Sequence, residues 1–163
     1  MRSSTRKLTL TAHITFSVGW LGAVACSLVL ALAGLTARDE QVVRAAYLAL
    51  SLTTSWITVP LSLAALASGL VQSWVTPWGL VRHYWVLIKL LLTVIATALL
   101  LLHAQPIRLI ATQAGIAVLS MTDLREARIH LAFDAAAALL TLLVATILSV
   151  YKPRGLTPWA TSV

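Results

Sequence analysis

The chain has 163 residues, of which 60% are apolar and only 10% are charged, and its formal net charge is +7. Soluble domains carry roughly 25% charged residues, so this composition excludes an ordinary soluble protein and indicates a membrane protein. The positive charge does not indicate a nucleic-acid partner, because the basic residues lie at the ends of apolar runs, where they set membrane orientation.

Four apolar stretches approach or exceed the ~20 residues with which a helix crosses a bilayer. They cover residues 14–35, 45–71, 84–102 and 131–150. The chain is therefore predicted to be all-α, an antiparallel four-helix transmembrane bundle in which residues 1–163 form a single domain. Thr76-Pro77 and Thr122-Asp123 predict helix starts. Residues 106–119 predict a separate short helix on the membrane surface.

Lys and Arg are slightly more numerous on the side of the termini than on the opposite side of these four crossings. This bias predicts a membrane protein with both termini in the cytoplasm. The six basic residues on the side of the termini are Arg2, Arg6, Lys7, Arg82, Lys152 and Arg154, against five in the other two loops.

The first span opens at His13 and contains Ser17, Trp20 and the only cysteine, Cys26. Ser17 follows His13 by four residues and could orient its ring. Gly19 and Gly22 flank Trp20 and would let another helix or a flat ring approach closely. Cys26 excludes an intrachain disulfide and is interpreted as a packing residue.

The second span has Pro60 near its middle, with several Ser and Thr residues around it. Proline frees a backbone carbonyl, and nearby hydroxyls can satisfy the backbone of a kinked membrane helix. A polar wall beside a cofactor or a quinone is the functional alternative.

The third span opens at His83, closes at His103 and is interrupted by Lys89. A lysine here can extend to the membrane surface. Alternatively, Lys89 lies about 40° from the face of His103 and could bind a propionate or another anionic group.

The fourth span opens at His130, and Asp134 follows one turn later on the same face. A metal-bound histidine commonly donates its second ring N–H to a carboxylate, so Asp134 is a candidate functional residue. Pairing with Arg128, or protonation, is the structural alternative.

All four histidines lie at span ends, two at each membrane face, in the pairs His13 with His83 and His103 with His130. Two histidines from different helices are the usual ligands of b-type haem iron. His83 and His103 are about 30 Å apart along one helix and about 200° apart around its axis. The protein could therefore bind two haems, one near each membrane face, or a single haem. Arg82 and Arg128, beside the histidines in the chain, complete the predicted cofactor-binding set.

Two motifs resemble small bacterial membrane proteins related to the copper-resistance protein CopD and to HemJ-type protoporphyrinogen oxidases. They are HITFSVGWLG, which begins at His13, and RHYWVLIKLLLTVIATALLLLH, which contains Trp85 and Lys89. HemJ-type proteins bind b-type haem and depend on a first-helix histidine and a third-helix lysine. The resemblance implies these roles for His13 and Lys89, and it implies a location in the bacterial cytoplasmic (inner) membrane.

These observations predict a haem b redox protein that binds one or two haems and passes electrons to or from a quinone or a small oxidant. Lys89 and Asp134 are its predicted catalytic residues, which would make it a membrane oxidoreductase. Copper handling ranks second, because Cu(I) favours sulfur ligands and the only methionines are Met1 and Met121. A non-catalytic accessory subunit is the third hypothesis. Candidate partners are the lipid bilayer, a quinone, and a second copy of the chain or another membrane subunit.

Overall fold

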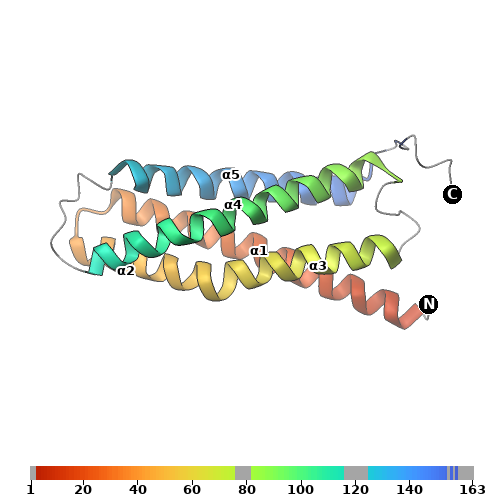
Figure 1. Ribbon diagram of the computed structural model, residues 1–163, viewed down its shortest axis with the longest axis horizontal. Helices are drawn as coiled ribbons and strands as arrows, with labels where there is room; N and C mark the ends of the chain where they lie inside the picture. The colour runs from red at the N-terminus through yellow and green to blue at the C-terminus, as the bar shows by residue number, and fades with distance from the viewer. Residues whose placement is uncertain (1–2, 76–81, 116–124, 154, 156, 158–163) are drawn as a thin grey trace.

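The fold was analysed in a computed structural model that describes residues 3–75, 82–115, 125–153, 155 and 157. The described helices, in chain order, are α1 (Ser3–Thr36), α2 (Glu40–Thr53), η1 (Thr54–Thr58), α3 (Val59–Val75), α4 (Tyr84–Gly115) and α5 (Arg125–Tyr151). Because α2, η1 and α3 form one continuous rod, four rods lie side by side, and α1 begins at the end of the bundle where α5 finishes (Figure 1).

Four rods of the described chain are long and apolar enough to cross a membrane. They cover Ser4–Thr36, Glu40–Trp74, Tyr84–Thr112 and Arg125–Tyr151. This confirms the predicted all-α four-helix bundle and makes the chain a multi-pass membrane protein. Each helix is longer than its predicted apolar run because helical hydrogen bonding continues past the apolar segment.

The predicted break after His103 is wrong, because α4 continues to Gly115. Ile107, Ile110 and Ala111 are buried, and the two isoleucines pack against Tyr47 and its neighbours on α2. This packing holds the helix through residue 106, where a separate surface helix was expected to begin. Residues 116–119 of that expected helix, and the predicted starts at Thr76-Pro77 and Thr122-Asp123, lie outside the described residues.

The surface of the bundle is apolar and its interior contains small and polar side chains, as expected of helices packed in lipid. Large apolar residues such as Val18, Leu102 and Phe133 are exposed. The interior holds two apolar clusters, one around Tyr47 and one around Trp20. The buried Ser and Thr residues of the described chain are Ser27, Thr54, Thr58, Ser62, Thr97 and Thr157.

The register of α1 against the α2–α3 rod is set by close contacts at three glycines. A Cβ on Gly34 would lie 2.7 Å from the ring of Tyr47, and one on Gly19 would lie 3.3 Å from Leu61. At the other end, a Cβ on Gly69 would lie 3.2 Å from the ring of His13. The antiparallel register therefore places residues of the two rods opposite each other along the whole bundle.

The α2–α3 rod changes geometry just before Pro60, as the sequence led us to expect. Proline has no N–H, and the π-helical segment η1 precedes it, with the Val59 N–H donating to the Thr54 carbonyl. The hydroxyl of Thr58 donates to the Thr53 carbonyl at 3.3 Å, and that of Ser62 donates to the Val59 carbonyl at 2.8 Å. Local hydroxyls thus supply hydrogen bonds around the irregular segment.

Candidate functional site

His13 lies at the meeting point of three helices, and each ring nitrogen has a polar neighbour. Its Nδ1 is 3.0 Å from Ser68 Oγ on α3, and its Nε2 is 3.4 Å from Lys89 Nζ on α4. A lysine ammonium can only donate, so Nε2 accepts from Lys89 and Nδ1 carries the proton that it donates to Ser68. The Ser68 hydroxyl in turn donates to the Ala65 carbonyl at 3.1 Å. The result is a directed chain of hydrogen bonds from the Lys89 ammonium to the backbone of α3.

Gly69 allows the ring of His13 to lie against the backbone of α3. A Cβ at this position would come within 3.2 Å of His13 Cε1, which is tighter than ordinary van der Waals contact. The sequence predicted Ser17 as the residue that orients His13, whereas the structure uses Ser68. Ser68 and Gly69 were not predicted as site residues, because the sequence of α3 does not indicate which helix these residues pack against.

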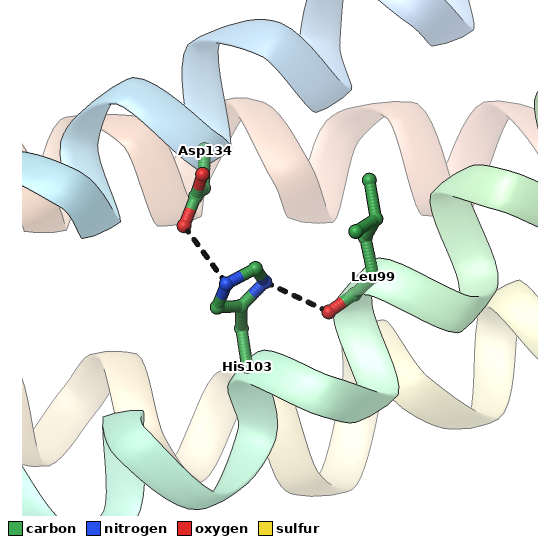
Figure 2. Close-up of polar contacts among 3 residues, drawn as sticks. All are labelled: Leu99, His103 and Asp134. Carbon is green, nitrogen blue, oxygen red and sulfur yellow. Dashed lines mark hydrogen bonds and ion pairs between the residues drawn. The ribbon is translucent and has the colours of Figure 1, made fainter.

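A second polar site joins His103 on α4 to Asp134 on α5 (Figure 2). Nδ1 of His103 is 2.9 Å from the Leu99 carbonyl, and Nε2 is 3.4 Å from Oδ2 of Asp134. A carbonyl only accepts, so Nδ1 carries a proton. Nε2 is therefore the ring nitrogen that faces the carboxyl group of Asp134.

Asp134 was predicted to serve His130 or to pair with Arg128, and the structure gives it another partner. It contacts His103, because α5 turns this face toward α4. His130, one turn earlier on α5, is exposed. The two side chains of the His103–Asp134 pair are 39% and 36% exposed, so they lie at the edge of the bundle and not in its interior.

Arg128, predicted to bind a cofactor, is buried in a contact between α1, α2 and α5. Its Nε donates to the Tyr47 hydroxyl at 2.9 Å, and its guanidinium carbon lies 5.3 Å from the centre of that ring. Its Nη2 donates to the Gly34 carbonyl in the last turn of α1. The carbonyls of a last helical turn lack helical partners and attract cations, so Arg128 stabilises this end of the bundle.

His83 and Arg82 lie just before α4, where the chain pairs with the segment after α5. The Thr157 N–H donates to the Arg82 carbonyl at 3.1 Å, and the Tyr84 N–H donates to the Gly155 carbonyl at 3.4 Å. The centroid of the His83 ring lies 6.4 Å from that of the Trp85 ring, and the two ring planes are inclined by 56°. The side chain of Arg82 is exposed.

The two polar sites lie at different depths in the membrane. Lys89 and His103 are 14 residues apart on α4, which is about 21 Å along the helix axis. Within the part of the chain that the structure describes, no three His, Cys, Asp or Glu side chains gather as a metal site. The His13 site offers an imidazole beside an amine from another helix, and the His103 site offers an imidazole beside a carboxyl group.

Comparisons with protein families, with curated proteins and with solved structures find no match for this chain. The chemistry open to the two sites therefore follows from their own geometry.

Proposed function

We propose that this chain is a membrane redox protein that binds b-type haem through His13. The observation that supports this proposal is the orientation of the His13 ring. Its Nδ1–H donates to Ser68 Oγ at 3.0 Å, which leaves the lone pair on Nε2. Metal-binding histidines usually have this arrangement, in which a hydrogen bond at one nitrogen holds the ring and selects the tautomer.

Lys89 supports the same proposal, because its amine lies beside the candidate ligand. Lysines that merely extend to the membrane surface turn their ammonium toward water. Nζ of Lys89 instead lies 3.4 Å from Nε2 of His13, 76 positions away in the chain. To ligate iron, His13 would exchange this contact for the metal, and the flexible lysine would become free to bind a propionate. The contact also joins the two residues to which the resemblance to HemJ-type proteins assigns roles.

The donor set suits haem better than a bare copper ion. Copper held by the protein alone would need several ligands together, and the described residues contain no cluster of three or more His, Cys, Asp or Glu side chains. Haem brings four ring nitrogens and needs only one or two protein ligands. When bound, it would supply one-electron transfer, with a quinone or a small oxidant as the proposed partner. His83, His103 and His130 remain candidates for a second ligand or a second haem, and the bacterial cytoplasmic membrane remains the proposed location.

An absorption spectrum of the detergent-purified chain, oxidised and then reduced, tests the proposal. We expect a reduced α band at the b-type position, and we expect His13→Ala to weaken or remove it. Thr15→Val is a matched control, because Thr15 is exposed on the same helix two residues away. A colourless wild-type protein after expression with ample haem would refute the proposal. A His13→Ala spectrum identical to that of the wild type would show that this residue is not the ligand.

A further inference from the structure

The outer side of α4 and α5 presents polar side chains at a depth where a membrane bundle normally faces lipid. His103 and Asp134 are 39% and 36% exposed, although both belong to membrane-spanning rods. Asp134 is nine residues from the start of α5 at Arg125, about 14 Å along the helix axis. Ionisable side chains inside a membrane are costly and almost always face protein or a water-filled cavity. The exposure of this pair therefore indicates a surface that another molecule covers.

The side chains beside the pair suit a contact between membrane helices. On α5, the residues four before, three after and seven after Asp134 share its side of the helix and are at least partly exposed. Two of these three are an alanine and a threonine, which let helix backbones approach closely in a membrane. On α4, the residue one turn before His103 is a leucine that is 48% exposed. The α4–α5 face consists of Leu99, His103, His130, Asp134, Ala137 and Thr141.

A second copy of the chain is complementary to this face. Copies of a membrane protein have the same orientation in the bilayer, so a two-fold axis that relates two of them runs along the membrane normal and leaves every residue at its own depth. His103 on α4 and Asp134 on α5 lie side by side at one depth, because Nε2 and Oδ2 are 3.4 Å apart (Figure 2). A rotation by 180° in front of the pair therefore places the imidazole of each copy opposite the carboxyl group of the other.

The hydrogen-bonding groups of the pair have capacity for this contact. Nδ1 of His103 is engaged by the Leu99 carbonyl at 2.9 Å, so Nε2 is the nitrogen directed out of α4. The carboxyl group of Asp134 has two oxygens, which together can accept several hydrogen bonds, so it can contact the histidines of both copies. A phospholipid headgroup fits less well, because headgroups lie near the ends of the rods and their phosphate has the same sign of charge as a carboxylate.

We infer that two copies of this chain pair through the α4–α5 face, with His103 of each copy against Asp134 of the other. The pairing shields both side chains from lipid and gives each one a further hydrogen-bonding group. Close packing and interhelical hydrogen bonds are the interactions that associate membrane helices. The inference assigns His103 to a protein contact and involves neither His13 nor Lys89. It can therefore fail while the proposed haem site at His13 stands, and the reverse also holds.

The single cysteine of the chain provides a control position on the opposite side of the bundle. Cys26 is exposed on α1. Gly19, seven residues earlier on the same side of α1, lies against Leu61 of the α2–α3 rod, so Cys26 is on the side of α1 away from α5. Ala31 and Ala132 pack in one cluster, and Cys26 and Ala137 are each five residues further along these antiparallel helices toward the same end. The two positions therefore lie at similar depths.

Disulfide cross-linking in membranes that contain the full chain tests the inference. A membrane-permeant oxidant is applied to the wild type, whose only thiol is Cys26, and to the double variant Cys26→Ala with Ala137→Cys. We expect the double variant to form cross-linked dimers and the wild type to remain monomeric. Adding Asp134→Leu or His103→Leu to the double variant should lower the cross-linked fraction several-fold. Thr146→Leu is the matched control, because Thr146 is an exposed residue of α5 outside the α4–α5 face, and it should leave the fraction unchanged.

Helical content and elution as a single species are checked for every purified variant, so that loss of fold is not counted as loss of pairing. An Ala137→Cys variant that stays monomeric would overturn the inference and leave this face to lipid or to a different protein. Equal cross-linking through Cys26 would also overturn it, because it would indicate random collision or pairing through another face. Folded Asp134→Leu and His103→Leu variants that cross-link as efficiently as their parent would show that the polar pair does not hold the copies together.

Discussion

Gly34→Ala should destabilise the bundle because the new Cβ has no room. It would lie 2.7 Å from Cε2 and Cζ of Tyr47, whereas carbon atoms in contact prefer about 3.5–4.0 Å. The ring would therefore have to move by about 1 Å, and Tyr47 is only 1% exposed. Overpacking of this kind typically costs about 1–3 kcal/mol.

The displacement of Tyr47 would also weaken its hydrogen bond with Arg128. The guanidinium donates to the Tyr47 hydroxyl at 2.9 Å, and hydrogen bonds to charged groups contribute about 1.5–3 kcal/mol. The better helix propensity of alanine offsets about 1 kcal/mol. We expect a net loss of about 2–4 kcal/mol, which for a chain of this size lowers Tm by on the order of 10 °C.

Thermal unfolding of the detergent-purified variants, followed by circular dichroism, measures this effect. Gly22→Ala is the matched control on the same helix, because a Cβ at Gly22 would meet no atom within 4 Å. Its Tm should be unchanged or slightly higher, since alanine favours the helix. A Gly34→Ala protein as stable as the wild type, or an equal loss in Gly22→Ala, would refute the packing argument.

Three further predictions follow from the site and the topology. Lys89→Met should keep the fold and lower haem content, because it removes the cation beside His13; an unchanged spectrum in a more stable protein would mean that the lysine only extends to the surface. Gly69→Ala should shift or weaken the haem spectrum, because its Cβ would push on the His13 ring from 3.2 Å, and a wild-type spectrum would contradict this. A C-terminal reporter should show that the C-terminus lies in the cytoplasm. A C-terminus on the outer side of the membrane would exchange the membrane faces of the two polar sites.

The candidate site was predictable in part, because some of its residues are unusual wherever they lie on a membrane helix. His13 and Lys89 stand out as ionisable residues in or beside apolar runs, and such residues are functional candidates by default. Their contact could not be read from the chain, because it depends on which faces of α1 and α4 turn toward each other. The same reason explains why Ser68 and Gly69 were missed.

Asp134 shows where reasoning along one helix fails. Spacing of four residues suggested His130 as its partner, yet the carboxylate faces His103 on the neighbouring helix. Local spacing identifies which residues share a face, and only packing decides what that face meets. Arg128 is a second example. Its position near the histidines in the chain predicted a contact with a cofactor, whereas its side chain hydrogen-bonds to Gly34 on α1 and to Tyr47 on α2.

The sequence by itself determined the four membrane helices, because the cost of exposing polar backbone to lipid acts on each apolar segment independently of the others. It did not determine where α4 ends, because residues beyond His103 stay helical through their contacts with α2. Nor did it determine the two polar pairs, His13 with Lys89 and His103 with Asp134. Those features depend on the rotation and register of whole helices, which are set by close contacts such as Gly34 with Tyr47 and Gly69 with His13. Such contacts join residues far apart in the chain, so only the tertiary structure reveals them.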